Sequence, residues 1–129
     1  MVDTNVLISL LVFSGKKMNQ MMEYIFMNHQ LVLSSYIVEE LKDVIKRKFP
    51  NKVGVIDTLL AKMNYEYVYT PDTLDETLFK IRDVKDYPVL YTAILEDVDI
   101  LVTGDNDFKD VYVEKPKIMT PTEFVNMYC

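Results

Sequence analysis

The chain has 129 residues, half of them hydrophobic, with only three glycines and a formal net charge of −6. This length and composition fit one folded domain over residues 1–129 and exclude a disordered or low-complexity chain. We expect no signal peptide and no membrane span, because no apolar run approaches the roughly 18 residues that a bilayer requires. The single cysteine, Cys129, excludes an internal disulfide and a thiolate-based zinc site, so the cytoplasm is the simplest compartment.

Apolar runs typical of strands alternate with segments whose apolar residues recur at helical spacing. Residues 7–13 are apolar and end at a break at residues 14–15, and residues 71–83 form an acidic, weakly patterned connection. Strands are expected at residues 1–3, 31–33, 65–69, 99–103 and 117–119, and helices at residues 17–28, 35–48, 53–64, 87–94 and 121–128. This alternation predicts an α/β layered domain with a mostly parallel sheet.

Three of the expected helices begin with recognisable start signals. Either Ser34 or Ser35 can cap the second helix, and Asp86 is suited to cap the fourth, with Pro88 in its first turn. Residues 120–123 (TPTE) have the pattern of a capping box with proline at the first helical position.

Four carboxylates stand where a parallel sheet would bring them together. Asp3 and Asp105 each follow an expected strand, whereas Glu40 and Asp86 stand in the expected first turn of a helix. The carboxyl ends of parallel strands meet at one edge of a sheet, and each βα connection starts a helix at that edge. We therefore expect these four side chains to share one cleft.

Four carboxylates in one cleft would repel one another, and Mg²⁺ or Mn²⁺ would remove that repulsion because both ions prefer oxygen ligands. Such a site is suited to hydrolysis of a phosphodiester. The net negative charge disfavours broad binding to nucleic acid, but a bound cation would invert the local sign. Taken singly, Glu40 or Asp86 could instead be a helix cap without a further role.

Four stretches resemble the acidic motifs of the PIN (PilT N-terminal) domain family, and of its toxin-like group from toxin–antitoxin operons. They are VDTNVLIS (residues 2–9), SSYIVEEL (residues 34–41), RDVKDYPVLYTAI (residues 82–94) and LVTGDNDF (residues 101–108). The closing IMTPTEFV (residues 118–125) fits that group's last strand and helix.

The resemblance implies a three-layer α/β/α sandwich with a five-stranded parallel sheet, and Mg²⁺- or Mn²⁺-dependent endoribonuclease activity. It places the acidic residues of the family on four positions and auxiliary roles on three more. The acidic positions are Asp3, Glu40 (with Glu39 as the alternative), Asp86 and Asp105, and the auxiliary residues are Asn5, Thr103 and Asp107. Asp83 reads as a surface acid of the preceding loop.

The expected partners are an RNA substrate and a cognate antitoxin protein, and the apolar helix faces are compatible with a homodimer. One alternative is a non-catalytic PIN-like module that binds RNA or a protein partner. A haloacid-dehalogenase-type phosphatase also begins with a strand and two acids, but Asn5 stands where its second acid belongs.

Overall fold

A computed structural model describes residues 1–13 and 15–129 of the chain. Its helices are α1 (Thr4–Leu11), α2 (Lys16–Asn28), α3 (Ser35–Lys48), α4 (Val53–Lys62), α5 (Tyr87–Leu95) and α6 (Pro121–Tyr128). Its strands are β1 (Val32–Ser34), β2 (Glu66–Val68), β3 (Ile100–Val102) and β4 (Lys117–Met119). Three short 3-10 helices complete it: η1 (Pro50–Lys52), η2 (Val84–Asp86) and η3 (Asn106–Phe108). The α/β class expected from the alternating pattern is confirmed.

The apolar run after Asp3 forms a helix that the sequence pattern did not predict. Helix α1 buries Val6, Leu7 and Leu10, which are spaced three and four residues apart. Because most of this short helix is apolar, it lacks the polar face that reveals an amphipathic helix. The Asp3 side chain caps α1 by accepting a hydrogen bond from the backbone N–H of Asn5, at 2.8 Å.

All strand pairing in the described residues is parallel. Strand β1 pairs with β2, and β3 pairs with β4. Val2 joins the second pair through a parallel bridge to Val102, supported by the bond from the Asp3 N–H to the Val102 carbonyl at 3.0 Å. The five expected strand positions are thus present, but hydrogen bonds join them as two groups rather than as one continuous sheet. Residues 1–3 bond to β3, and the described residues include no such bond from them to β1.

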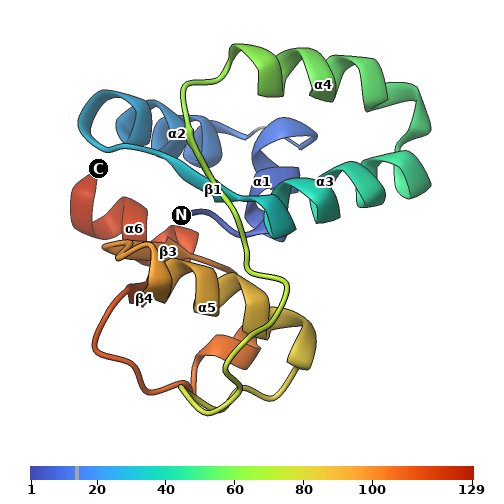
Figure 1. Ribbon diagram of the computed structural model, residues 1–129. Helices are drawn as coiled ribbons and strands as arrows, with labels where there is room; N and C mark the ends of the chain where they lie inside the picture. Colours follow the sequence, from blue (N-terminus) through green and yellow to red (C-terminus); the bar gives the residue numbers. More distant parts are fainter. Residues whose placement is uncertain (14) are drawn as a thin grey trace.

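The helices pack on the strands as one hydrophobic core (Figure 1). Figure 1 shows α2, α3 and α4 in the upper half of the view and α5 in the lower half, with α6 at mid-height below α2. Helix α2 packs on α6, and α3 contacts both α1 and α5, so the two halves are joined across the core. Helix α3 follows β1 without a connecting loop, and α5 follows the η2 turn directly. The starts of α3 and α5 lie near each other, because the Tyr36 hydroxyl of α3 donates at 2.8 Å to the Lys85 carbonyl just before α5.

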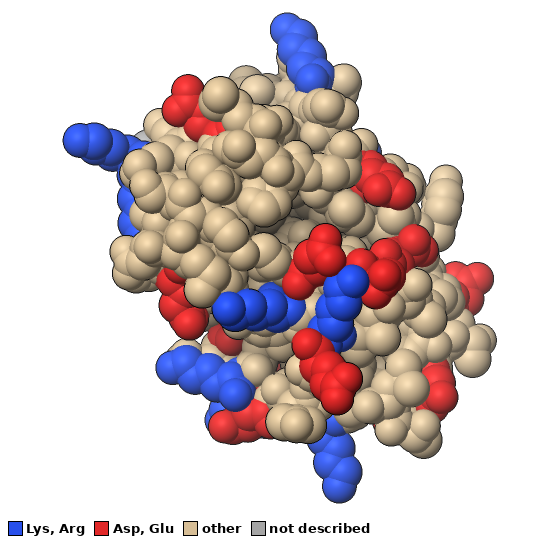
Figure 2. Space-filling model, turned by 90° about the vertical axis from the view of Figure 1, so that its left-hand side faces the viewer, with Lys and Arg blue, Asp and Glu red and all other residues tan. Residues whose placement is uncertain are grey.

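Charged side chains are mixed on the face drawn in Figure 2, where acidic and basic groups alternate around a hollow. That face has no continuous basic surface of the kind that binds nucleic acid through phosphates alone. In the part of the chain that the structure describes, no helix is both long enough and apolar enough to cross a bilayer.

Candidate metal centre

Asp3 is a buried carboxylate held by two hydrogen-bond donors. It lies between the Val2 bridge and the start of α1, and only 6% of the residue is exposed. Its Oδ1 accepts from the backbone N–H of Asn5, and its Oδ2 accepts from the buried hydroxyl of Thr103 at 2.5 Å. Burial raises the pKa of Asp3 and these two hydrogen bonds oppose the rise, while the charges of Glu40 and Asp105 add to it.

The turn after β3 positions a second group of acids through local hydrogen bonds. The Thr103 hydroxyl that donates to Asp3 also accepts from the backbone N–H of Asp105 at 3.1 Å. Asp105 in turn caps η3 by accepting from the N–H of Asp107 at 2.9 Å. Thr103 therefore connects the Asp3 carboxylate to the turn that carries Asp105 and Asp107.

Asp86 stands at the N-cap position of α5 but does not cap it. Its backbone is in the right-handed helical region and its side chain makes no cap hydrogen bond, so the expectation that it caps the helix is wrong. Its Oδ2 is buried and, among the described residues, has no hydrogen-bond partner. Burial raises the pKa of Asp86 to about 7, with further contributions from the adjacent Asp105 carboxyl and from the charges of Asp83 and Asp3.

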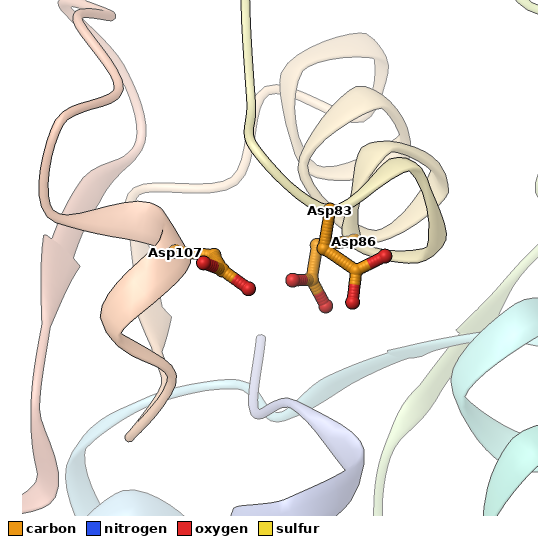
Figure 3. Close-up of side chains that lie close together, drawn as sticks. All are labelled: Asp83, Asp86 and Asp107. Atoms are coloured by element: carbon orange, nitrogen blue, oxygen red, sulfur yellow. The ribbon is translucent and has the colours of Figure 1, made fainter.

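Three carboxylates from two segments point toward one another at this place (Figure 3). Asp83 and Asp86 come from the turn around η2, and Asp107 comes from η3. Each offers an oxygen, and these three oxygens all lie within 4.8 Å of one another. Arg82 balances part of this charge, because its Nε lies 2.9 Å from Oδ1 of Asp107.

Glu40 reaches the site from α3. The helix begins at Ser35, capped by the Ser34 hydroxyl, so Glu40 lies in its second turn and not in its first as expected. Glu40 is half-buried, and its charge contributes to the raised pKa of Asp3. Glu39, the alternative, is exposed.

The structure thus brings the predicted acids close enough for their charges to influence one another. They do not, however, form one compact group of four. Asp3 is influenced by Glu40 and Asp105, and Asp86 by Asp105 and Asp3. Within the described residues, however, the tightest group of carboxylates joins Asp83 and Asp107 to Asp86. Asp83 is half-buried in this group rather than free on the surface.

The spacing of Asp83 and Asp86 was the available signal for this group. Asp83 caps the 3-10 turn η2 and Asp86 is its last residue, and residues three positions apart in such a turn lie above one another. The turn itself, η2 at residues 84–86, was not among the expected elements. Asn5 supports Asp3 through its backbone amide, and the residue is exposed.

The chemistry of these groups fits a divalent cation. All donors are carboxylate or hydroxyl oxygens, which suit Mg²⁺ and Mn²⁺, and no cysteine or histidine is among them. A buried carboxylate oxygen without a partner is costly unless a positive group completes its contacts. Asp86 Oδ2 is such an oxygen, and like-charged carboxyls surround it.

Comparison with known proteins gives the family and the fold of this chain. The sequence profile of the PIN domain matches residues 1–107, and the chain belongs to the PIN domain family. A search of curated proteins finds no match. Among solved structures, the chain is similar to one from the crystal structure of VapBC2 from Rickettsia felis bound to a DNA fragment from their promoter. The TM-score is 0.69 at 19% identity, over 92% of this chain and 95% of that one. This similarity shows that the two chains share a fold.

Proposed function

We propose that this chain is a Mg²⁺- or Mn²⁺-dependent endoribonuclease, with residues 1–129 forming a single nuclease domain. The observation that carries the proposal is the buried, unpartnered Oδ2 of Asp86 among converging carboxylates. Membership of the PIN domain family supports the same reading. Neither a structural cap nor a surface ion pair accounts for an acid in this position, because Asp86 makes no cap bond.

The cation would be held by Asp3, Glu40, Asp86, Asp105 and Asp107, and we add Asp83 to this set because of its place beside Asp86. When bound, it would lower the pKa of the attacking water and offset the charge that develops on the phosphoryl oxygens. The carboxylates would orient that water and accept its proton. Thr103 would hold Asp3 and the Asp105 turn in register, and the backbone of Asn5 would fix the Asp3 carboxylate.

The biological role that we propose is that of the toxin in a toxin–antitoxin pair, acting in the cytoplasm. The similarity to a chain of the VapBC2 complex supports this role, as do the sequence motifs of the toxin-like group. The antitoxin would silence the enzyme by placing a basic side chain among the carboxylates. The ion pair of Arg82 with Asp107 is an example of a guanidinium held in this place. A homodimer is compatible with the proposal.

The test is cleavage of a panel of single-stranded and structured RNAs in Mg²⁺, in Mn²⁺ and in EDTA. We expect cleavage that requires the cation and is lost in Asp105→Asn, which keeps the shape of the side chain but removes its charge. Thermal unfolding provides a second readout, because a cation that binds only the folded state stabilises it by about 2.7 kcal/mol at a concentration 100 times its Kd.

Asp57→Asn is the matched control. Asp57 is an exposed acid of α4, a helix that contributes no residue to the acidic cluster. This variant should cleave RNA and respond to Mg²⁺ as the unmodified chain does. If the folded protein cut none of the RNAs in either cation, the nuclease proposal would be wrong, and the non-catalytic binding module would replace it.

A further inference from the structure

Two exposed tyrosines stand side by side, Tyr67 on strand β2 and Tyr69 directly after the strand ends. Because successive side chains of a strand point to opposite faces, Tyr67 and Tyr69 share one face while Val68 is buried on the other. Tyr67 is 42% exposed and Tyr69 is 75% exposed. Their rings meet edge to face, with centroids 5.2 Å apart and an interplanar angle of 85°. The pair therefore presents aromatic surface to the solvent in a fixed arrangement.

The tyrosine pair forms one wall of a groove of about 410 Å³, within the size range of small-ligand sites. Tyr36 and Glu39 of α3 line the groove from the other side, and Asp72 and Pro88 also line it. The walls are held together near their base: the Thr70 N–H donates to the Ser35 hydroxyl at 2.9 Å, and the Thr92 hydroxyl donates to that of Thr70 at 2.8 Å. The groove is thus formed before any ligand binds.

The groove lies beside the segment that carries Asp83 and Asp86. The Tyr36 hydroxyl donates at 2.8 Å to the carbonyl of Lys85, which stands in the turn between Asp83 and Asp86. Pro88, at the start of α5, lines the groove two residues after Asp86. A strand of RNA with a phosphate at the carboxylates could therefore lay a neighbouring base into the groove.

The charges of the groove select against phosphate and in favour of a base. Its charged lining residues are Glu39 and Asp72, and the described lining contains no lysine or arginine. Ionised carboxylates only accept hydrogen bonds, so they suit the exocyclic amino groups of adenine, cytosine and guanine. Uracil lacks an amino group, and its single N3–H donor stands between two carbonyl oxygens that a carboxylate repels. Tyrosine rings add stacking, which tolerates any base.

We propose that the Tyr67–Tyr69 groove holds one unpaired, amino-bearing nucleobase of the RNA strand that the acidic cluster cuts. The tyrosines supply the stacking surface, and Glu39 is the specificity-determining residue that accepts from the amino group. The assignment of this base to an RNA substrate rests on the proposed function.

The test measures fluorescence anisotropy of labelled oligo(A), oligo(C) and oligo(U) RNAs in Ca²⁺, a cation that also prefers carboxylate oxygens. Oligo(A) and oligo(C) should bind more tightly than oligo(U). The double variant Tyr67→Ala, Tyr69→Ala should bind oligo(A) about tenfold more weakly, as expected for loss of base stacking. Glu39→Gln should abolish the preference over oligo(U), because an amide can donate to uracil as well as accept.

Two variants separate recognition from folding. Tyr67→Phe with Tyr69→Phe keeps both rings and should keep the affinity, so a loss confined to the alanine pair comes from stacking. Tyr112→Ala removes a tyrosine that is 91% exposed and does not line the groove, and its affinity should not change. Thermal unfolding of each variant checks that it is folded.

The failure of this inference differs from failure of the nuclease proposal. If the unmodified chain and the folded alanine pair bind all RNAs equally, the groove does not take a base; a surface reserved for a protein partner would give this result. An equal affinity of the unmodified chain for oligo(A) and oligo(U) would overturn the role of Glu39. Base-dependent binding in Ca²⁺ without cleavage in Mg²⁺ or Mn²⁺ would sink the nuclease proposal and leave the groove as proposed.

Discussion

The starts of helices α5 and α6 have similar sequences and opposite electrostatics. Each has an acid and a proline in or before its first turn: Asp86 and Pro88 at α5, and Glu123 and Pro121 at α6. At α6, Thr120 and Glu123 form a reciprocal capping box, and these hydrogen bonds lower the pKa of Glu123. At α5 the acid makes no cap bond, and burial among other carboxyls raises its pKa to about 7.

The difference teaches that an acid at a helix start takes its role from its tertiary neighbours. Glu123 is exposed, and the groups that influence it are the Thr120 cap and the basic side chains of Lys109 and Lys117. Besides burial, three other carboxyl groups raise the pKa of Asp86, those of Asp105, Asp83 and Asp3. The formation of α5 does not depend on these groups. An acid that stands at a helix start without capping the helix is typical of a functional site. The rest of the fold supplies the stability that such a site loses.

The largest difference between the two helix starts is expected when the acid at each one is neutralised in a separate variant. In Asp86→Asn we expect RNA cleavage to fall by at least about 100-fold, because a charged group at the reacting centre is lost. Glu123→Gln should leave the rate unchanged, because glutamine also completes a capping box. Initial cleavage rates in Mg²⁺ measure both effects.

Stability supplies the control for this pair of variants. Without a divalent cation, Asp86→Asn should unfold no more easily than the unmodified chain, since it removes one of several charges that repel one another. If Asp86→Asn unfolded the protein, or if the two variants lost activity alike, Asp86 would be no more than a structural residue.

The pH dependence of stability should have opposite signs at the two helix starts. The pKa of Asp86 rises from 3.8 to about 7 on folding, so between these values the folded state binds more protons than the unfolded state. In EDTA, the contribution of Asp86 to the free energy of unfolding should therefore fall as the pH rises from about 4 to 7. Glu123 has a lowered pKa, so its contribution is present above its ordinary pKa of 4.5 and is lost as the pH falls further.

Urea unfolding between pH 4 and pH 8 measures the contribution of Asp86. The difference in unfolding free energy between the unmodified chain and Asp86→Asn should decrease across this range and then level off. The difference also contains the interaction of Asp86 with Asp3, whose pKa is raised too, because neighbouring charges are not independent. A difference that does not change with pH would contradict the raised pKa of Asp86.

The smallest effect is expected at the capped helix. Thr120→Ala removes the hydroxyl that accepts from the Glu123 N–H and should cost about 1 kcal/mol of unfolding free energy. Urea unfolding at pH 7 measures this cost, and Thr120→Ser, which keeps a hydroxyl, should recover most of it. Cleavage of RNA should remain at the original rate in both. An unchanged stability in Thr120→Ala would show that the capping box contributes nothing to α6.

Local signals in the sequence were sufficient for several elements of the fold. The capping box of α6 is confirmed, as are strand β4 at residues 117–119 and the end of α3 at Lys48. These features depend on neighbours within one turn or one strand, which the sequence displays directly. Helix α1 was missed because its apolar residues leave no polar face to mark the period. The division of the strands into two hydrogen-bonded groups depends on pairing partners far apart in the chain.

For the candidate site, the sequence by itself determined which acids stand after strands or near helix starts, because those positions follow from local pattern. Only the tertiary structure decided that Asp86 lacks a cap bond while Asp83 and Asp107 lie close to it. It also decided that Thr103 connects Asp3 to the Asp105 turn, across 100 residues of chain. The physical reason is that burial and the approach of like charges arise from contacts between distant segments, which no local pattern encodes.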